Sequence, residues 1–427
     1  MTGDRIVFLT SQNPLVEDYK HWYSRMKFYS DTVVKIAENL GVGQVDVVYY
    51  KSNLEDNNSL CSDESSAELL RSSFNDTPYI YENCYYLKEF CSEKGIRLDI
   101  LSIDEELGKG PDGLKLVLFG ILNDLPKYMK AVVYRYEQVV SMSKNGYLYL
   151  SSDAELSDHQ YILPKKIGFL DFIAKVDESR DIFSKLRGVV ITEITDKNIL
   201  NAYESIGISR DKVKYLPMVI SASHRRLGSR PKVWDMPNKD GKVMILRNML
   251  LWKDQRPSLI ENLKGRFVLY DSSLPASRRK VIHYVEDNGG VYKNARYWST
   301  EKIHNIIGGH SFMLGMSTPT SDRYTYKIVE SFLSGTVCIL PKILLDAIGM
   351  KDSLCQYILD TYSDMFLIDY DNFDNSASEL PGKLDELTND PARYIHMVLR
   401  HGRFINEYFE YDSMVVNSCI EDIINIL

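Results

Sequence analysis

The stretch from Arg323 to Lys342, RYTYKIVESFLSGTVCILPK, carries charged and hydroxyl side chains at helical spacing. If a helix spans 324–334, its polar side chains share one face: Arg323, Lys327, Glu330, Ser331 and Ser334. Free N–H groups at a helix start attract phosphate, and Lys327 one turn inside adds a positive charge. Glu330 can accept hydrogen bonds from both hydroxyls of a ribose. One interpretation of the stretch is therefore a nucleotide site.

The same polar face also fits a second interpretation, a solvated helix surface with an internal Lys327–Glu330 pair. The spacing alone leaves both interpretations open. Gly335 is expected to end the helix, and TVCILP after it predicts a buried strand. Ser321 or Asp322 is the expected cap at the helix start.

The elements that must position these side chains alternate between apolar strand patterns and helix-length segments. The expected strands of the first half are RIVFLT, VDVVYY, RLDILSI, KLVLFGIL, GYLYLSS, GVVITEI and KVKYLPMVI. Those of the second half are KVMILRN, RFVLYDS, GVYKN, SFMLGMS, TVCILP and DMFLIDY. Such alternation indicates crossover connections and a parallel sheet.

The stretch SASHRRLGSRPKVWDMPNKDGK interrupts this pattern and has the composition of a linker. We therefore expect an α/β domain at 1–220, a basic linker at 221–242, a second α/β domain at 243–400, and a C-terminal helix at 401–427 packing back on the first domain. Ligands of open α/β sheets bind where strands end, so the two domains are expected to face each other across a cleft.

The composition excludes several classes of protein. The 427 residues are 44% hydrophobic and 26% charged, as in globular proteins, and no apolar run predicts a membrane span. The six cysteines form no CxxC pair, which argues against a zinc site and a disulfide framework. We expect a cytoplasmic monomer that binds no membrane. Because the net charge is −8, binding of any nucleic acid would require a local basic surface on the protein.

The Lys327–Glu330 segment resembles the nucleotide-binding element of GT-B glycosyltransferases, in which a glutamate holds the ribose and a preceding basic residue contacts the diphosphate. It is most similar to the DNA glucosyltransferases of T-even bacteriophages, closest to the beta-type enzyme, which has Arg-x-x-Glu here. Lysine keeps the charge of that arginine but loses its bidentate fork. The resemblance covers roughly 114–220 and 242–401, and it implies a fold of two Rossmann-like domains.

KVMILRNMLLWKDQRPSLIENLKGRFVLYDS resembles the first strand and helix of that family's second domain, where a Gln-Arg pair contacts the nucleotide. Gln255 and Arg256 match this pair. The family's glycine-rich loop is missing before them, so backbone contacts to phosphate are not transferred. Arg247 and Lys253 resemble the Arg and Lys that other GT-B enzymes place after this strand.

GYLYLSSDAELS resembles the strand and loop that carry the beta-type enzyme's catalytic aspartate. This resemblance assigns Asp153 as the base that takes a proton from the acceptor hydroxyl, with Glu155 as the fallback, in an inverting transfer. The same letters also fit a helix cap, a role that would leave Asp153 outside the chemistry.

The family resemblance implies a UDP-sugar as donor and double-stranded DNA containing 5-hydroxymethylcytosine as acceptor, with the base flipped out. A phage-encoded enzyme of this kind acts in the host bacterial cytoplasm. Two basic clusters are the candidate DNA contacts: Arg225, Arg226, Arg230 and Lys232 in the linker, and Arg278, Arg279 and Lys280 in the second domain. Both clusters also fit solvated surfaces, and the transferred sugar is left open among glucose, arabinose and others.

No obligatory cofactor is expected, although the family resemblance implies Mg²⁺ or Mn²⁺ bound to the diphosphate. The sequence LIDYDNFDN resembles a DxD metal motif through Asp369, Asp371 and Asp374. We interpret these aspartates as capping the loop before a helix. His310, beside two glycines, is the one histidine expected near the cleft, with a structural role favoured. Two alternatives remain, a GT-B enzyme acting on a bacterial glycan or another non-DNA acceptor, and a nucleotide-sugar-binding protein without catalysis.

Overall fold

The computed structural model describes residues 3–10, 23–49, 88, 90–120, 129–151, 184–191, 198–220, 240–246, 253–254, 256–271, 275–294, 300–315, 326–342 and 353–427. The chain divides into two compact units. The first comprises Met1–Glu193, Lys197–Ser223 and Tyr411–Leu427, and the second comprises Ile194–Asp196 and His224–Glu410. Among the described residues, the helices are too short or too polar to cross a lipid bilayer.

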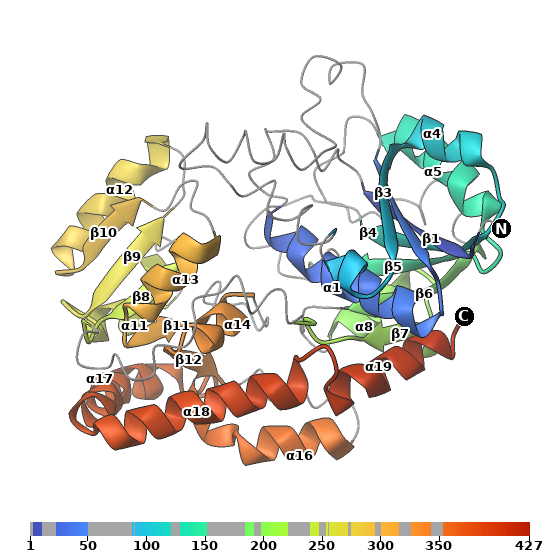
Figure 1. The fold of residues 1–427 in the computed structure, drawn as a ribbon. Helices are drawn as coiled ribbons and strands as arrows, with labels where there is room; N and C mark the ends of the chain where they lie inside the picture. Colours follow the sequence, from blue (N-terminus) through green and yellow to red (C-terminus); the bar gives the residue numbers. More distant parts are fainter. Residues whose placement is uncertain are drawn as a thin grey trace. The chain divides into compact units, whose positions relative to one another are not determined.

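The first unit is built on a seven-stranded parallel sheet in the order β3-β2-β1-β4-β5-β6-β7 (Figure 1). Its strands are β1 (Arg5–Thr10), β2 (Gln44–Tyr49), β3 (Arg97–Ser102), β4 (Leu114–Gly120), β5 (Tyr147–Ser151), β6 (Leu186–Ile191) and β7 (Val213–Tyr215). Its helices are α1 (Tyr23–Asn39), α4 (Ile103–Lys109), α5 (Met129–Met142), α8 (Asn198–Ser205) and α19 (Met414–Ile424). The strands are apolar on both faces because helices cover a parallel sheet on both sides.

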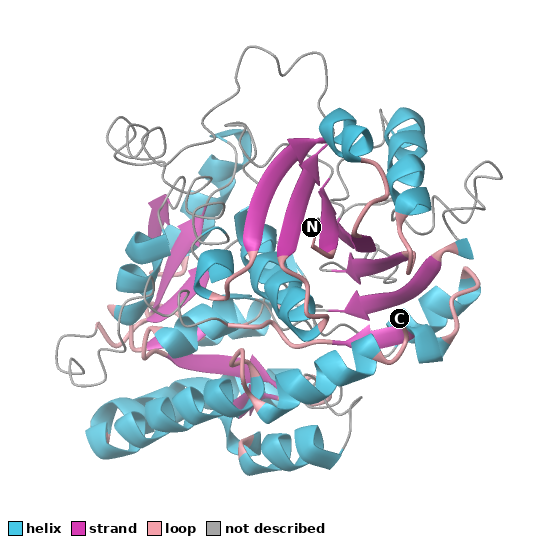
Figure 2. Cartoon of the chain, turned by 45° about the vertical axis from the view of Figure 1, so that its right-hand side comes forward, coloured by secondary structure: helices cyan, strands magenta, loops and turns pink. Residues whose placement is uncertain are grey.

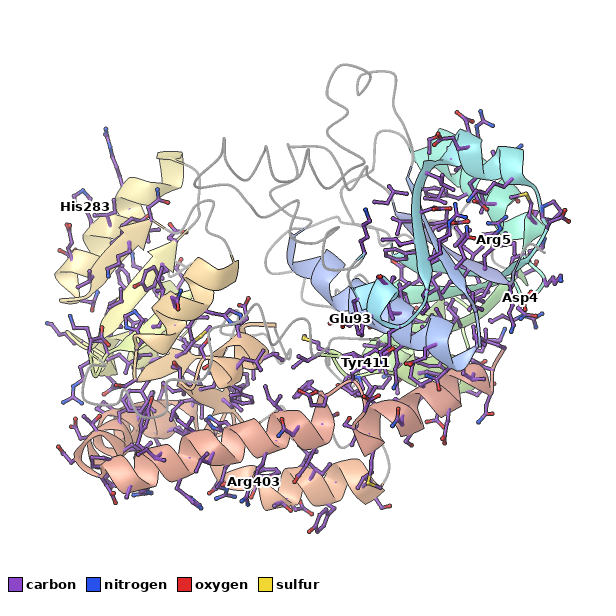
Figure 3. All side chains as sticks on the ribbon, in the orientation of Figure 1. Asp4, Arg5, Glu93, His283, Arg403 and Tyr411 are labelled. Carbon is purple, nitrogen blue, oxygen red and sulfur yellow. The ribbon has the colours of Figure 1, made fainter. Side chains whose placement is uncertain are left out.

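Charges are buried at the start of β1 in this first unit. Arg5, labelled in Figure 3, lies with its Nη1 3.1 Å from Asp46 Oδ2 and also pairs with Glu106. All three side chains are almost fully buried. Burial raises the pKa of Glu106, although the hydrogen bond from Arg5 opposes this rise. The network joins β1, β2 and α4.

The second unit is built on a six-stranded parallel sheet in the order β10-β9-β8-β11-β12-β13. Figure 2 draws the strands in magenta and the helices in cyan. Its strands are β8 (Val243–Leu246), β9 (Phe267–Asp271), β10 (Val291–Asn294), β11 (Phe312–Leu314), β12 (Val337–Pro341) and β13 (Phe366–Ile368). Its helices are α11 (Pro257–Asn262), α12 (Pro275–Asp287), α13 (Thr300–Gly308), α14 (Tyr326–Leu333), α16 (Ser353–Thr361), α17 (Phe373–Asn389) and α18 (Pro391–Tyr408). The two parallel sheets confirm the predicted α/β class.

The C-terminal residues belong to both units. Helix α18 is part of the second unit, and the chain returns to the first unit at Tyr411, whereas the predicted C-terminal segment began at 401. Tyr411 donates a hydrogen bond from its hydroxyl to Glu38 Oε2 at 2.7 Å, and Lys35 Nζ lies 4.1 Å from its ring centroid. These contacts attach the returning segment to α1.

Candidate functional site

The strand order of the second sheet defines a topological switch point between β8 and β11. From β8 the chain moves through β9 to β10 at one edge, and from β11 it moves through β12 to β13 at the other. Right-handed crossovers then place α11 and α12 on one face and α13 and α14 on the other. Ligands of open α/β sheets bind at the carboxyl ends of the strands beside such a point.

The packing agrees with this assignment of faces. From α11, Leu259 packs in one core cluster with Val243 and Ile245. From α13, Ile307 packs in another cluster with Met244, the residue between them on β8. Successive residues of a strand point to opposite faces, so α11 and α13 cover opposite sides of the sheet.

Helix α14 follows β11 and carries Glu330, the predicted ribose ligand. Ile328, Val329 and Phe332 form its buried apolar stripe, as predicted. The polar face is buried too, because Glu330 is only 5% exposed and both Ser331 and Ser334 are fully buried. The interpretation of this face as a solvated surface is therefore wrong for these residues.

Helix α14 ends at Gly335, as the sequence predicts. Gly335 has φ of 69°, a conformation that favours glycine, and its N–H donates to Phe332 O at 3.2 Å. The N–H of Thr336 donates to Ser331 O at 3.0 Å, which completes a Schellman motif. The Thr336 hydroxyl donates to Ile307 O at 2.7 Å, so the end of α14 is attached to α13.

Glu330 faces a histidine of α13 that the sequence reasoning did not single out. The Nε2 atom of His304 lies 3.8 Å from Glu330 Oε1, and the His304 side chain is fully buried. In the part of the chain that the structure describes, neither ring nitrogen of His304 has a hydrogen-bond partner. The segment TEKIHNIIG offered no signal for this contact, because α13 and α14 meet only in the folded sheet.

Gly315 directly follows β11 and has no room for a side chain. A Cβ atom at this position would lie 2.4 Å from Cys338 Sγ and 2.9 Å from Leu340 Cδ2, both on β12, and 3.2 Å from Ile328 Cγ1 on α14. The backbone that leads toward α14 therefore lies directly against β12. The signal in the sequence was the glycine at the end of SFMLGMS, whose packing role was not recognised.

Arg256, the predicted diphosphate ligand, stands immediately before α11 on the other side of the switch point. Its guanidinium lies 4.7 Å from the ring centroid of Phe373 and 5.7 Å from that of Tyr370. Ser258 on α11 donates to Asp374 Oδ1 at 2.6 Å, which also joins α11 to the start of α17. Arg256 forms no ion pair with a carboxylate among the described residues. Aromatic rings therefore contact the guanidinium, whose N–H groups are not occupied by a carboxylate of the described residues.

The acidic motif after β13 is occupied by contacts within the protein. Asp369 Oδ2 lies 3.1 Å from Lys342 Nζ, and Asp369 Oδ1 accepts a hydrogen bond from the N–H of Asp371. Asp374 accepts the hydrogen bond from Ser258. Within the described ranges no cluster of three acidic, histidine or cysteine side chains has the arrangement of a metal site. These aspartates fit the predicted role of stabilising a loop and a helix start.

Both ring nitrogens of His310 lie close to polar side chains of the second unit, which indicates a structural role. Its Nδ1 lies 3.0 Å from Asp240 Oδ1, and its Nε2 lies 3.0 Å from the hydroxyl of Tyr270. Burial and the charge of Asp240 raise the pKa of Tyr270 to about 12. Burial alone would raise the pKa of Asp240, but the hydrogen bond from His310 and the N–H of Lys242 lower it overall. The three residues connect the starts of β8 and β11 to β9.

The remaining predicted site residues are described in part. Lys253, Arg279 and Lys280 are exposed, and Lys253 Nζ lies 5.6 Å from the ring centroid of Tyr284 on α12. Lys327 and Arg278 lie in α14 and α12, but their side chains are outside the description. The residues that fall wholly outside the described ranges are Asp153, Glu155, Arg225, Arg226, Arg230, Lys232, Arg247 and Gln255.

No protein-family model and no curated protein sequence matches this chain. Solved structures do resemble it over nearly its whole length. An alpha-glucosyltransferase in complex with UDP-glucose and DNA containing an abasic site has a TM-score of 0.58 at 11% identity, covering 99% of each chain. Anabaena HepE in complex with UDP and glucose has a TM-score of 0.56 at 11% identity, covering 99% of this chain and 100% of HepE.

A third similar structure is the N-terminal domain of a trehalose-6-phosphate phosphatase from Candida albicans, with a TM-score of 0.52 at 10% identity, covering 99% of this chain and 98% of that one. Identities this low establish the architecture and leave activity open. The chain has the GT-B-like fold, two parallel-sheet α/β units, that these glycosyltransferase structures share.

Proposed function

We propose that this protein is a glycosyltransferase that moves a sugar from a UDP-sugar to the hydroxyl of 5-hydroxymethylcytosine in double-stranded DNA. The observation that carries the proposal is the buried carboxylate of Glu330, placed on α14 one turn inside the carboxyl edge of the sheet at its switch point. Burial of a carboxylate is costly unless the carboxylate is paired and hydrogen-bonded.

In the proposed donor site, Glu330 accepts hydrogen bonds from the two ribose hydroxyls of UDP. Side chains on a helix point toward its start, so the Glu330 carboxylate is directed to the edge where nucleotides bind. Arg256 binds the diphosphate from the opposite side of the switch point. Its guanidinium is fixed by Phe373 and Tyr370 and has no acidic partner among the described side chains.

Four further side chains complete the proposed donor site, in the roles that the family resemblance implies: Arg247, Lys253, Gln255 and Lys327. The exposed position of Lys253 just before α11 agrees with a contact to the nucleotide. Together with Arg256, these cations stabilise the negative charge that develops on the departing UDP.

In the transfer step, the acceptor oxygen attacks the anomeric carbon while the bond from that carbon to the diphosphate oxygen breaks. Asp153 takes the proton of the acceptor hydroxyl, and UDP leaves with the electron pair of the broken bond. Attack from the side opposite to UDP inverts the configuration of the sugar. A divalent cation, which the family resemblance implies, would be held by the diphosphate of UDP in this proposal.

Two observations support DNA as the acceptor. Similar structures include an alpha-glucosyltransferase in complex with UDP and DNA containing an HMU base, with a TM-score of 0.55. Arg278, Arg279 and Lys280 lie in the second turn of α12, which begins after β9 at the carboxyl edge of the sheet. Arg279 and Lys280 are exposed and form no ion pair within the described part of the chain, so they are available to phosphates.

A non-DNA acceptor is the second candidate. The similarity to HepE, whose complex contains UDP and glucose, is as strong as that to the DNA-binding structures. The net charge of −8 also favours an uncharged acceptor.

The test is incubation of the protein with duplex DNA containing 5-hydroxymethylcytosine, with matched unmodified DNA, and with a panel of UDP-sugars. Mass analysis of the nucleosides is expected to show a sugar added only to the modified base. Hydrolysis of a UDP-sugar without any mass change on the DNA would support the non-DNA acceptor. Nucleotide binding without turnover would support a protein that lacks catalysis.

A further inference from the structure

Helices α13 and α14 lie side by side on one face of the second sheet, and each carries a buried polar residue at the same depth. Both helices follow strands that end at the carboxyl edge, so they run in the same direction. His304 is the fifth residue of α13, and Glu330 is the fifth residue of α14. With a rise of about 1.5 Å per residue, both lie about 6 Å inside their helix starts.

The environment of His304 is not that of a histidine held by hydrogen bonds within the described residues. The side chain is fully buried, yet neither ring nitrogen has a hydrogen-bond partner among the described residues. Burying such polar atoms without partners destabilises the folded state, so buried groups of this kind are nearly always paired. The carboxylate of Glu330 faces this ring, with 3.8 Å between Nε2 and Oε1.

This distance is too long for a hydrogen bond but short enough for one to form after a small side-chain rotation. The opposite environment is found at His310, whose two ring nitrogens both have partners at 3.0 Å. Among the described residues, His304 therefore has an unused donor that faces the proposed ribose ligand.

We propose that His304 is a positioning residue for Glu330. When Glu330 binds the ribose diol, His304 donates a hydrogen bond from Nε2 to Oε1 and fixes the plane of the carboxylate. This role rests on the proposed function of Glu330, and it adds a residue of α13 that determines the preference for a ribonucleotide over a deoxyribonucleotide.

The matched ligands for a test are UDP and 2′-deoxy-UDP, which differ by one of the two hydroxyls that Glu330 binds. For the wild-type protein, isothermal titration is expected to show tighter binding of UDP by about tenfold or more. For His304→Leu, binding of UDP weakens by about tenfold while binding of 2′-deoxy-UDP changes little, so the preference is lost. For His304→Gln, whose amide retains an N–H donor, most of the preference returns.

His401→Leu is the control variant. His401 is also buried and also contacts α14, but through the ring of Phe332 at 4.4 Å between centroids. This variant is expected to keep the wild-type preference for UDP. If the preference survives His304→Leu, the positioning role is wrong while the proposed function stands.

If the wild-type protein itself binds UDP and 2′-deoxy-UDP equally, Glu330 does not bind the ribose hydroxyls. His304 then has no positioning role either. A folded His304→Gln variant, checked by circular dichroism, decides the matter if His304→Leu does not fold. Loss of the preference in His304→Gln as well as in the control would assign His304 to packing alone and would overturn the proposal.

Discussion

The guanidinium of Arg256 lies 4.7 Å from the ring centroid of Phe373, which joins the start of α11 to the start of α17. In many proteins a buried or half-buried arginine is held by a carboxylate, which also neutralises it. Here the aromatic rings fix the guanidinium without neutralising its charge. The arrangement suits a residue whose partner is an incoming anion.

Replacement of Arg256 tests this use of its charge. We expect Arg256→Ala to weaken UDP binding by about 10- to 100-fold, because a charge-assisted contact to the diphosphate is lost. Arg256→Lys is expected to recover only part of the affinity, since lysine keeps the charge but lacks the planar fork. Titration with UDP measures both.

Lys383→Ala is the matched control, because Lys383 is a surface cation paired with Glu379 on α17. Its UDP affinity is expected to equal that of the wild-type protein. Equal losses in Lys383→Ala and Arg256→Ala would show that only the overall charge of the unit matters.

Replacement of Gly315 tests the packing between β11, β12 and α14. We expect Gly315→Ala to destabilise the protein by about 1–3 kcal/mol, because the new methyl group would overlap Cys338 Sγ and Leu340 Cδ2. The second substitution Cys338→Ala removes the nearest atom, so the double variant is expected to regain part of the stability relative to Gly315→Ala. Denaturant unfolding measures these differences.

The comparison for Gly315→Ala is Gly402→Ala on α18, where a Cβ atom would meet nothing within 4 Å. Alanine there is expected to stabilise the helix by about 0.5–1 kcal/mol. If Gly315→Ala were stabilising as well, the close approach between β11 and β12 would be contradicted.

His401 makes the stability of the protein depend on pH. Burial, together with the charge of Arg400, lowers the pKa of His401 from 6.5 to about 3. Between these two values the unfolded chain binds a proton that the folded protein does not, so the free energy of unfolding falls as the pH falls. We expect His401 to account for a loss of about 2 kcal/mol between pH 7 and pH 5.

Urea unfolding at several pH values checks this expectation. His401→Leu is expected to flatten the pH dependence in this window, whereas His283→Leu on the exposed surface of α12 is expected to leave it unchanged (Figure 3). An unchanged pH profile in His401→Leu would mean that another group is responsible.

Replacement of Asp153 tests the assignment of this residue as the catalytic base. The assignment remains a prediction from the family resemblance. We expect Asp153→Asn to abolish sugar transfer, by at least about 100-fold, because the amide cannot take the acceptor proton. Binding of UDP is expected to stay at the wild-type level, since Asp153 belongs to the acceptor side. An active Asp153→Asn variant would overturn the assignment and leave Glu155 as the candidate base.

Much of the fold could be predicted from the sequence. Each of the thirteen apolar patterns singled out corresponds to one strand of the two sheets, with bounds that differ by a few residues. Strand patterns are local, since a parallel strand is apolar on both faces and is bounded by polar segments. The end of α14 at Gly335 was likewise predictable, because glycine favours the left-handed conformation that terminates a helix.

The candidate site was predictable only in part. Helical spacing identified Glu330 but suggested a solvated face, because periodicity separates two faces without showing what covers each one. The covering helix α13 and its His304 follow β10, at the far edge of the sheet, and their contact with α14 exists only after the sheet has formed. The aromatic support of Arg256 by Phe373 was missed for the same reason, since the two residues are more than one hundred positions apart in the chain.

The central claim is that the carboxylate of Glu330 binds the ribose of a nucleoside diphosphate. The most direct measurement is isothermal titration of UDP into the wild-type protein and into Glu330→Gln, which keeps the shape of the side chain and removes its charge. We expect wild-type binding and a loss of at least about tenfold in Glu330→Gln, because hydrogen bonds to a charged acceptor are lost. Equal affinities in the two proteins, or no binding of UDP by the wild-type protein, would contradict the claim.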